Sequence, residues 1–351
     1  GLLLASPPIM SGSFLEFENP IRDAISRIRF APQSNNLLIS SWDSHVRLYD
    51  VDASIVRFEA PGEASIMDCC FQNELIAFSA ASDGTITRYD LCSGIHDEIA
   101  THDDIATCVQ YSDETCQVIS AGWDRKIMSK DTRMTEAFTD LAILNSEVDS
   151  MSLCRFNLMV AAGELVNMYD LRNLRRPVQS KESCLGFWIK CICSIPHNCE
   201  GFAVGTVDGR VTLKIPNSSS SDDQGYTFRC HPKSRSGKDY FVSVNDIVFD
   251  PCMPGVFVTG NSEGYVVAWD AQKKRRHSEF KRCPCSVASL SYNSGGQLLA
   301  AASSYTYQDA KETGSFASSG TNCGREEPPK IFVHKTDSSC LQSNFPGSSS
   351  G

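Results

Sequence analysis

Short runs in which apolar and polar residues alternate make up much of the chain. The first of these runs is "ISRIRF" at residues 25–30, and it is followed by "NLLISS" at 36–41 and "HVRLYD" at 45–50. Alternation with a period of two is typical of half-buried β-strands, and the small, Asp and Gly residues between the runs are typical of tight turns. The pattern predicts an all-β chain of short strands.

One unit of this pattern recurs along the chain. Its first four copies are "SSWDSHVRLYD", "SAASDGTITRYD", "SAGWDRKIMSKD" and "AAGELVNMYD", which end at Asp50, Asp90, Asp131 and Asp170. A period of about 40 residues that ends in an aromatic-Asp pair is the signature of a four-stranded propeller blade. Three less regular units follow, at residues 189–215, 244–270 and 287–335. The sequence therefore predicts a single seven-bladed β-propeller of WD repeats.

The propeller is predicted to cover residues 13–335. Residues 1–12 are expected to form a flexible N-terminal extension, in which Met10 is the natural start. The polar, low-complexity residues 336–351 are expected to form a disordered tail.

An early strand, "FLEFEN" at residues 14–19, is expected to be the outermost strand of the seventh blade. Such a strand closes the ring and removes a free sheet edge. The segments at 217–225 and 311–329 lack strand composition, so both are expected to be surface loops.

The formal net charge of the 351-residue chain is -10, from 32 basic and 42 acidic residues. This balance argues against general binding to nucleic acids or membrane surfaces, which requires broad positive charge. No apolar run approaches the roughly 20 residues that span a bilayer. The 16 cysteines sit mostly in apolar runs of a large chain without a secretory signal. They are expected to be reduced thiols in the cytosol or nucleus rather than a disulfide framework.

Catalytic groups are not gathered in any motif of the sequence. The seven histidines are scattered, and His102 is expected to hydrogen-bond Asp124 and hold a tight turn. The pair Cys283 and Cys285 has no second Cys or His pair at zinc spacing. We therefore expect no catalytic residue, no metal and no cofactor, and the chain is not expected to be an enzyme. The acidic residues at equivalent blade turns are expected to bond turn backbone: Asp43, Asp83, Asp124 and Asp208.

Positive charge nevertheless gathers in one stretch, "YTFRCHPKSRSGKDY" at residues 226–240. Arg229 leads this stretch, and Arg210 lies in the strand unit before it. Arginine suits phosphate because its planar fork donates two parallel hydrogen bonds. By charge pattern alone, a solvated surface or pairing with Asp208 and Asp222 is the favoured interpretation, because runs of charge are usually solvated faces.

Several stretches are more specific than a generic WD repeat: "YTFRCHPKS", "VTGNSEGYVVAWDAQKKRR" and "SVASLSYNSGGQLLAAASSYTYQ". With "LLISSWDSHVRLYD", "SAGWDRKI", "MYDLRNL" and "DGRVTL", they make the chain resemble the budding-uninhibited-by-benzimidazole WD-repeat family of the mitotic spindle checkpoint, over residues 13–334. A related family is the nucleoporin-binding WD-repeat proteins of mRNA export. The resemblance implies a scaffold that binds a glutamate-bearing motif of the checkpoint kinase and its kinase-like relative. It also implies binding to a phosphothreonine motif of a kinetochore scaffold protein.

The resemblance assigns roles to five residues. Lys190 in "FWIKCI" is expected to face the glutamates, whereas Arg210 in "DGRV" and Arg229 in "FRCH" are expected to grip the phosphate. Trp42 and Trp123 match the tryptophans of the family's peptide-binding face. Lys190 stands where the family has Arg, which suggests a divergent, plant-like paralogue with an altered peptide preference. Lys130 and Trp188 are further departures from the pattern.

Two other functions remain open at the sequence level. "KDTR" at residues 130–133 and "YDLR" at 169–172 fit the Asp-x-Arg pattern of substrate receptors of cullin-type ubiquitin ligases. An adaptor of mRNA export at the nuclear pore would use a similar ligand motif. The checkpoint interpretation predicts a nuclear protein that is at kinetochores during mitosis, with the cytoplasm as a further location, and with neither nucleic acid nor membrane as a direct partner.

Overall fold

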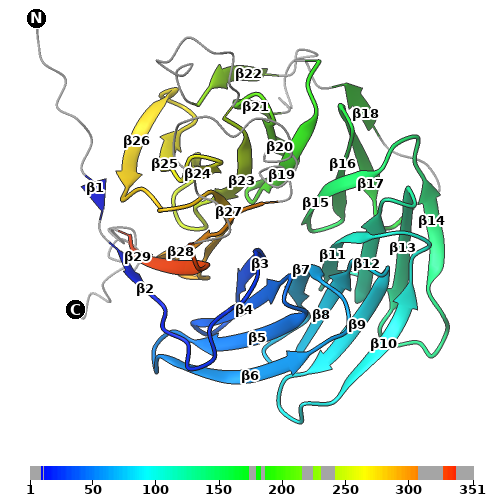
Figure 1. Cartoon of the computed structure of the whole chain (residues 1–351). Helices are drawn as coiled ribbons and strands as arrows, with labels where there is room; N and C mark the ends of the chain where they lie inside the picture. The colour runs from blue at the N-terminus through cyan, green and yellow to red at the C-terminus, as the bar shows by residue number, and fades with distance from the viewer. Residues whose placement is uncertain are drawn as a thin grey trace, which may run out of the picture.

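The computed structural model is an all-strand ring of seven antiparallel sheets around a central axis (Figure 1). This fold is a seven-bladed β-propeller, as the repeat pattern predicts. The structure describes residues 9–10, 12–173, 179–182, 186–215, 224–230, 242–306 and 327–336. In that part of the chain, no helix has the length and apolar character needed to cross a bilayer.

The blades, numbered I to VII in chain order, each have four strands ordered from the axis outward, and the sheet of blade VI gains a fifth strand, β1 (Ile9–Met10). Blades I to III contain β3 (Ile25–Phe30), β4 (Asn36–Ser41), β5 (His45–Asp50), β6 (Ile55–Pro61), β7 (Ile66–Phe71), β8 (Ile76–Ala81), β9 (Thr85–Asp90), β10 (His96–Thr101), β11 (Ala106–Ser112), β12 (Gln117–Gly122), β13 (Lys126–Asp131) and β14 (Thr139–Ile143). Blades IV and V contain β15 (Val148–Cys154), β16 (Asn157–Ala162), β17 (Leu165–Asp170), β18 (Gln179–Glu182), β19 (Ile189–Ile195), β20 (Asn198–Thr206), β21 (Arg210–Ile215) and β22 (Gln224–Arg229).

Blades VI and VII combine the C-terminal strands with the first strands of the chain. They contain β23 (Val244–Phe249), β24 (Val256–Asn261), β25 (Val266–Asp270), β26 (Arg275–Phe280), β27 (Val287–Tyr292), β28 (Leu298–Ser303) and β29 (Lys330–Lys335), with β1 (Ile9–Met10) beside β26 and β2 (Gly12–Phe14) beside β29.

The ring is closed by β2, which pairs antiparallel with β29 and becomes the outermost strand of blade VII. The prediction that residues 14–19 form this strand is wrong in position, because the paired residues are Gly12–Phe14 and only the Leu15 N–H continues the contact, to the Ile331 carbonyl at 2.8 Å. Ile9–Met10 pairs parallel with β26, within the segment that the sequence predicts to be a flexible extension. Residues 1–8 and 337–351 lie outside the described residues.

The apolar core is divided among the seven interfaces between neighbouring blades. Each cluster of buried side chains takes residues from two blades, such as Ile119 and Val160 between blades III and IV, or Leu213 and Phe257 between blades V and VI. The strands carry apolar residues on both faces, and each sheet packs these two faces against the sheets of the two neighbouring blades. The repeat pattern therefore places the core between the blades, and the axis is left to polar side chains.

The first strand of each blade is a sheet edge that faces the axis, and polar side chains of the preceding blade satisfy its backbone. Asp68 accepts the Val109 N–H at 2.9 Å, Asp246 accepts the Leu290 N–H at 2.7 Å, and Ser289 accepts the Ile28 N–H at 3.2 Å. Arg27 joins this ring, with its Nε 3.0 Å from Asp68 and its Nη1 3.6 Å from Asp246. One guanidinium of blade I thus ties together blades II and VI.

The predicted turn-holding histidine is confirmed. His102 Nδ1 hydrogen-bonds Asp124 Oδ2 at 2.9 Å, and its Nε2 hydrogen-bonds Ser120 Oγ at 2.8 Å. The side chains of His102 and Asp124 are buried, and Asp124 also accepts the Lys126 N–H at 3.1 Å. This histidine connects the loop before β11 to the turn between β12 and β13.

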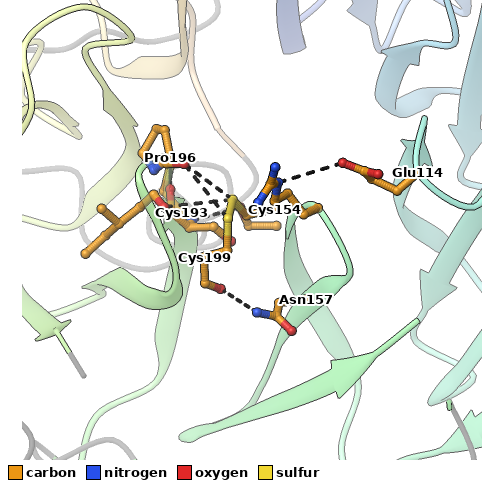
Figure 2. The surroundings of a disulfide bond; sticks show 10 residues. Glu114, Cys154, Asn157, Cys193, Pro196 and Cys199 are labelled. Atoms are coloured by element: carbon orange, nitrogen blue, oxygen red, sulfur yellow. Dashed lines mark hydrogen bonds and ion pairs between the residues drawn. A yellow bond between two sulfur atoms is a disulfide. The ribbon is translucent and has the colours of Figure 1, made fainter. Parts of the chain in front are cut away.

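The expectation of reduced cysteines is corrected at two places. A disulfide joins Cys154, at the end of β15, to Cys199, near the start of β20, with their Cα atoms 5.2 Å apart (Figure 2). This bond links blades IV and V, beside the hydrogen bond from Asn157 Nδ2 to the Cys199 carbonyl at 3.1 Å. Cys285 is also disulfide-bonded. The other cysteines of the described residues are reduced thiols, as predicted. Burial raises the pKa of Cys69 to about 12, so this thiol stays protonated.

Replacing His102 with alanine is expected to lower the free energy of unfolding by about 2 kcal/mol. The substitution leaves the buried Asp124 carboxylate without one of its partners, and an unsatisfied buried polar group costs about 1–3 kcal/mol. Denaturant unfolding of His102→Ala measures the loss. The control is His277→Ala, an exposed histidine that is expected to change stability by less than about 0.5 kcal/mol. Equal effects of the two substitutions would contradict the turn-holding role.

Deleting residues 1–14 is expected to cause aggregation, because it removes β2 and leaves β29 as an open sheet edge. Light scattering and thermal unfolding of the truncated protein test this. The matched control lacks only residues 1–8 and keeps both N-terminal strands. A monodisperse protein with unchanged Tm after the longer deletion would show that ring closure does not depend on β2.

Candidate functional site

The five residues that the sequence singles out come from one side of the ring. We call it the upper face, and define it by the turns between the second and third strands of the blades, at residues 42–44, 82–84, 123–125 and 207–209, and by the loops that lead into the first strands. Trp42 and Trp123 lie on the turns of blades I and III. Arg210, Arg229 and Lys190 all belong to blade V.

Arg210 and Arg229 are brought together by strand register. Arg210 begins β21 and Arg229 ends β22, and the two residues are paired directly opposite each other. Neighbouring strands hold paired residues about 5 Å apart, so two like charges would repel at this position. The repulsion is relieved by a carboxylate that both arginines share.

That carboxylate belongs to Asp208, whose side chain is completely buried. Its Oδ2 is 2.9 Å from Arg210 Nε and 3.5 Å from Arg229 Nη2, and Arg229 Nη1 donates to the Asp208 carbonyl at 2.7 Å. Thr206 Oγ1 donates to the other carboxylate oxygen. Two cations and one anion leave a formal net charge of +1, with both guanidiniums held in place.

The turn that carries Asp208 requires Gly209. Its φ is +87°, a backbone conformation that favours glycine, and an added Cβ would lie 2.5 Å from the Val242 carbonyl oxygen. The same turn appears in other blades, where the acidic residue has a different task. Asp83, at the equivalent position of blade II, is exposed and accepts the Thr85 N–H at 3.0 Å and the Thr85 hydroxyl at 2.7 Å.

The predicted role of the turn acids is therefore confirmed for Asp83, as it is for Asp124 above and for Asp43, which accepts the His45 N–H at 3.3 Å. It is wrong for Asp208. Within the described residues its carboxylate binds the Thr206 hydroxyl and the two arginines and accepts no turn N–H. The sequence interpretation that Arg210 and Arg229 pair with Asp208 is correct, while Asp222 lies outside the described residues.

Two aromatic residues before β19 complete the surroundings of the arginine pair. The Arg210 guanidinium carbon lies 5.1 Å from the centre of the Phe187 ring, a cation–π distance. Trp188 is 45% exposed, and its Nε1 donates to Asp149 Oδ2 at 2.6 Å. At the sequence level, Trp188 stands out only as a departure from the family pattern, and Phe187 carries no prediction. The signal available was the aromatic pair in "GFWIK", directly before a strand.

Lys190 occupies a β-bulge in the first strand of blade V. The pairing of β19 with β20 shifts between Ile189 and Cys191, which leaves Lys190 as the extra residue, and its side chain is half-buried. The equivalent bulge residues of blades I and III, Ser26 and Thr107, donate to backbone carbonyls of the following blade at 2.6 Å. Bulges aim these side chains toward neighbours at the upper end of the axis.

The two tryptophans lie on other blades than the arginine pair. Trp42 packs edge to face on Tyr305 with ring centres 5.8 Å apart, and its Nε1 is buried without a hydrogen-bond partner in the described part of the protein. Trp42 and Trp123 therefore share the upper face with Lys190 and the arginines, but they do not belong to the Asp208 cluster. The remaining cations of the basic stretch, at residues 231–241, lie outside the described residues.

The two Asp-x-Arg segments lie on the opposite face, at the turns after β13 and β17. Each arginine binds its own aspartate: Arg133 Nη2 is 2.6 Å from Asp131 Oδ2, and Arg172 Nη2 is 2.6 Å from Asp170 Oδ2. These hydrogen bonds lower the pKa of both aspartates to about 2. The described residues contain no group of three or more His, Cys, Asp or Glu side chains placed to hold a metal ion.

Known proteins match this chain over nearly its whole length. The model of the family "WD domain, G-beta repeat" matches residues 15–50. The chain is similar to mitotic checkpoint protein BUB3.3 of Arabidopsis thaliana, with 48% identity over 93% of this chain and 100% of the relative. It is similar to BUB3.1 of the same plant, with 37% identity over 92% of both chains. Mitotic checkpoint protein bub3 of Dictyostelium discoideum is 31% identical over 92% of this chain and 95% of that protein.

Replacing Asp208 with alanine is expected to lower the free energy of unfolding by about 3 kcal/mol, because the two arginines lose their shared carboxylate and face each other across β21 and β22. Asp83→Ala is the matched control at the same turn position. That aspartate is exposed and is expected to contribute less than about 1 kcal/mol. Chemical denaturation measures both. Similar losses for the two variants would show that Asp208 is an ordinary turn residue.

Proposed function

Because the chain belongs to the BUB3 family of mitotic checkpoint proteins, we propose that it is a non-enzymatic scaffold of the spindle assembly checkpoint that binds short acidic and phosphothreonine peptides on its upper face. The supporting observation is the Asp208 cluster. It holds two guanidiniums side by side on a rigid sheet. Propellers present binding surfaces of this kind from turns on a fixed ring.

The donors that the cluster leaves available support a phosphate ligand. Arg210 uses its Nε for Asp208, so its two Nη groups make no hydrogen bond within the described residues, and its side chain is 32% exposed. Arg229 is 28% exposed and uses both Nη groups to hold the turn of Asp208. A phosphothreonine offers about -1.5 to -2 charges and three acceptor oxygens. The net +1 of the cluster and the unused fork of Arg210 complement that group.

The acidic peptide is proposed to lie nearer the axis of the upper face. Lys190 supplies a single point charge there, in place of the planar fork of an arginine. Trp42 and Trp123 are proposed to provide apolar contact for side chains of the peptide. The partners are a checkpoint kinase and its kinase-like relative, through a glutamate-bearing motif, and a kinetochore scaffold through its phosphothreonine motif. We propose the nucleus, and kinetochores during mitosis, as the location of the protein.

The ubiquitin-ligase alternative depends on the Asp-x-Arg segments of the opposite face. Arg133 and Arg172 are exposed on adjacent blades, so both remain accessible to a partner. Affinity purification from dividing cells separates the alternatives. Recovery of checkpoint kinases agrees with the proposal, whereas recovery of ligase adaptor subunits without them, or of nuclear-pore proteins alone, would contradict it.

Replacing either Arg210 or Arg229 with alanine is expected to weaken binding of a phosphothreonine peptide about ten-fold or more. Hydrogen bonds to charged groups contribute about 1.5–3 kcal/mol, and 1.4 kcal/mol corresponds to a factor of ten in Kd. The double variant is expected to lose less than the sum, because both side chains serve one phosphate. Calorimetric titration with phosphorylated and unphosphorylated versions of one peptide measures these changes.

The control for this titration is Arg57→Ala. Arg57 is an exposed arginine of blade I that pairs with Asp50 at 2.7 Å, and its loss is expected to leave Kd unchanged. Equal affinity of the natural protein for the phosphorylated and unphosphorylated peptides would remove the phosphate role. An equal loss of peptide affinity in the Arg210→Ala, Arg229→Ala and Arg57→Ala variants would point to general charge attraction instead of a site.

A further inference from the structure

A second groove lies on the outer rim of the ring, between blades V and VI, away from the Asp208 cluster. It has a volume of about 340 Å³ and is lined by the outer strand of blade V and by the end of β25 and the start of β26 in blade VI. The lining residues are Tyr226, Thr227, Phe228, Trp269, Asp270, Lys274 and Arg275. A volume of this size accommodates one or two side chains of a ligand, not a folded domain.

The floor of the groove is a continuous row of aromatic rings. The ring centres of Tyr226 and Phe228 are 5.9 Å apart, and those of Phe228 and Trp269 are 4.9 Å apart. Trp269 is held in place by the hydrogen bond from its Nε1 to Thr259 Oγ1 at 2.9 Å, and the Tyr226 hydroxyl donates to the Ala271 carbonyl at 2.8 Å. The polar atoms of both rings are thus engaged, and the ring surfaces that line the groove are rigid and apolar.

The rim is positively charged. The segment 273–276 is "KKRR", in the turn and strand that border the groove. Lys274 Nζ lies 4.7 Å from the centre of the Tyr226 ring. Arg275 is exposed and makes no ion pair or hydrogen bond within the described residues. The neighbouring cations are already occupied, Lys273 by Asp270 at 3.3 Å and Arg276 by Glu279 at 3.9 Å.

This groove is separate from the arginine pair. Tyr226 is three residues from Arg229 along β22, a distance of about 10 Å. Successive side chains of a strand point to opposite faces, so Tyr226 and Phe228 share one face of β22 while Thr227 and Arg229 share the other. The hydroxyl contact between Thr227 and Thr212, at 2.9 Å, places Thr227 against its own sheet. Apart from Thr227, the groove is therefore lined by side chains that do not contact the arginine pair.

From the aromatic floor and the cationic rim, we propose that this groove binds an acidic peptide segment through one aromatic side chain. The ring of the ligand packs against Phe228, beside the largely buried Trp269. Carboxylates on either side of it face Lys274 and Arg275. Two cations without an ion pair in the described part of a protein of net charge -10 give a short attractive patch, which suits a few carboxylates rather than a long polyanion. The groove is thus a second peptide site that acts independently of phosphorylation.

Fluorescence polarisation tests the proposal with a labelled heptapeptide, Glu-Asp-Glu-Trp-Glu-Asp-Glu, and two relatives in which Trp is replaced by Ala or every acid by Lys. The natural protein is expected to bind the Trp peptide at least about five-fold more tightly than the Ala peptide, and not to bind the Lys peptide. The double variant Lys274→Glu with Arg275→Glu is expected to weaken the Trp peptide about ten-fold or more. The matched control reverses two exposed cations elsewhere, Arg155→Glu with Lys335→Glu, and is expected to leave binding unchanged.

Two further comparisons decide the occupant and the independence of the site. The double variant Arg210→Ala with Arg229→Ala is expected to keep its affinity for the Trp peptide. The double variant Lys274→Glu with Arg275→Glu is expected to keep its affinity for a phosphothreonine peptide. Failure of one site is therefore distinguishable from failure of the other. Equal binding of the Trp and Ala peptides, equal loss in the control variant, or displacement of the peptide by single-stranded DNA at equal charge concentration would each overturn the proposal. The last outcome would identify the patch as a general polyanion surface.

Discussion

The ring depends on satisfying the backbone of seven inner sheet edges. The first strand of each blade pairs only with the second strand, so the N–H groups on its other side face the axis and the preceding blade. Side chains of the preceding blade accept them, as Asp68 accepts Val109 and Asp246 accepts Leu290. The cost of an unpaired buried N–H makes these acceptors necessary. Arg27 binds the two aspartates, so its positive charge partly compensates their two negative charges inside the ring.

The backbone of the outer sheet edges must also find hydrogen-bond partners, which are water or a further strand. Most blades finish with a fourth strand that is exposed to water, but blade VII lacks one from its own part of the chain. The N-terminal strand Gly12–Phe14 supplies it, so the two ends of the chain are held together and the ring cannot open without unpairing that strand. Rigid closure of this kind keeps the turns of all seven blades in fixed positions, which is what a surface for short peptides requires.

The candidate site is built on the turn between the second and third strands of a blade, which also occurs in other blades. Asp83 and Asp124 bond the backbone of their turns, and Asp124 is fastened further by His102. Asp208 occupies the same place, but it is buried and holds two arginines that strand pairing has set opposite each other. Positive charge is thereby concentrated locally on an acidic protein. Screening over about 10 Å at ordinary salt makes such a patch independent of the overall charge.

Much of this protein was determined by the sequence alone. The alternating runs, the 40-residue period and the Asp turns are local signals, and they predicted the seven blades and the bond between His102 and Asp124. The ion pairs of Arg210 and Arg229 with Asp208 entered only as the alternative to a phosphate site. Only the tertiary structure decided which residues from distant blades meet. The closing strand lies at Gly12–Phe14 rather than 14–19, and Cys154 reaches Cys199. The aromatic floor between blades V and VI also joins residues of two repeats. The sequence period predicts where each strand lies and which of its residues are apolar. The contacts between repeats depend on strand register and on the geometry of the ring, which a local sequence pattern does not contain.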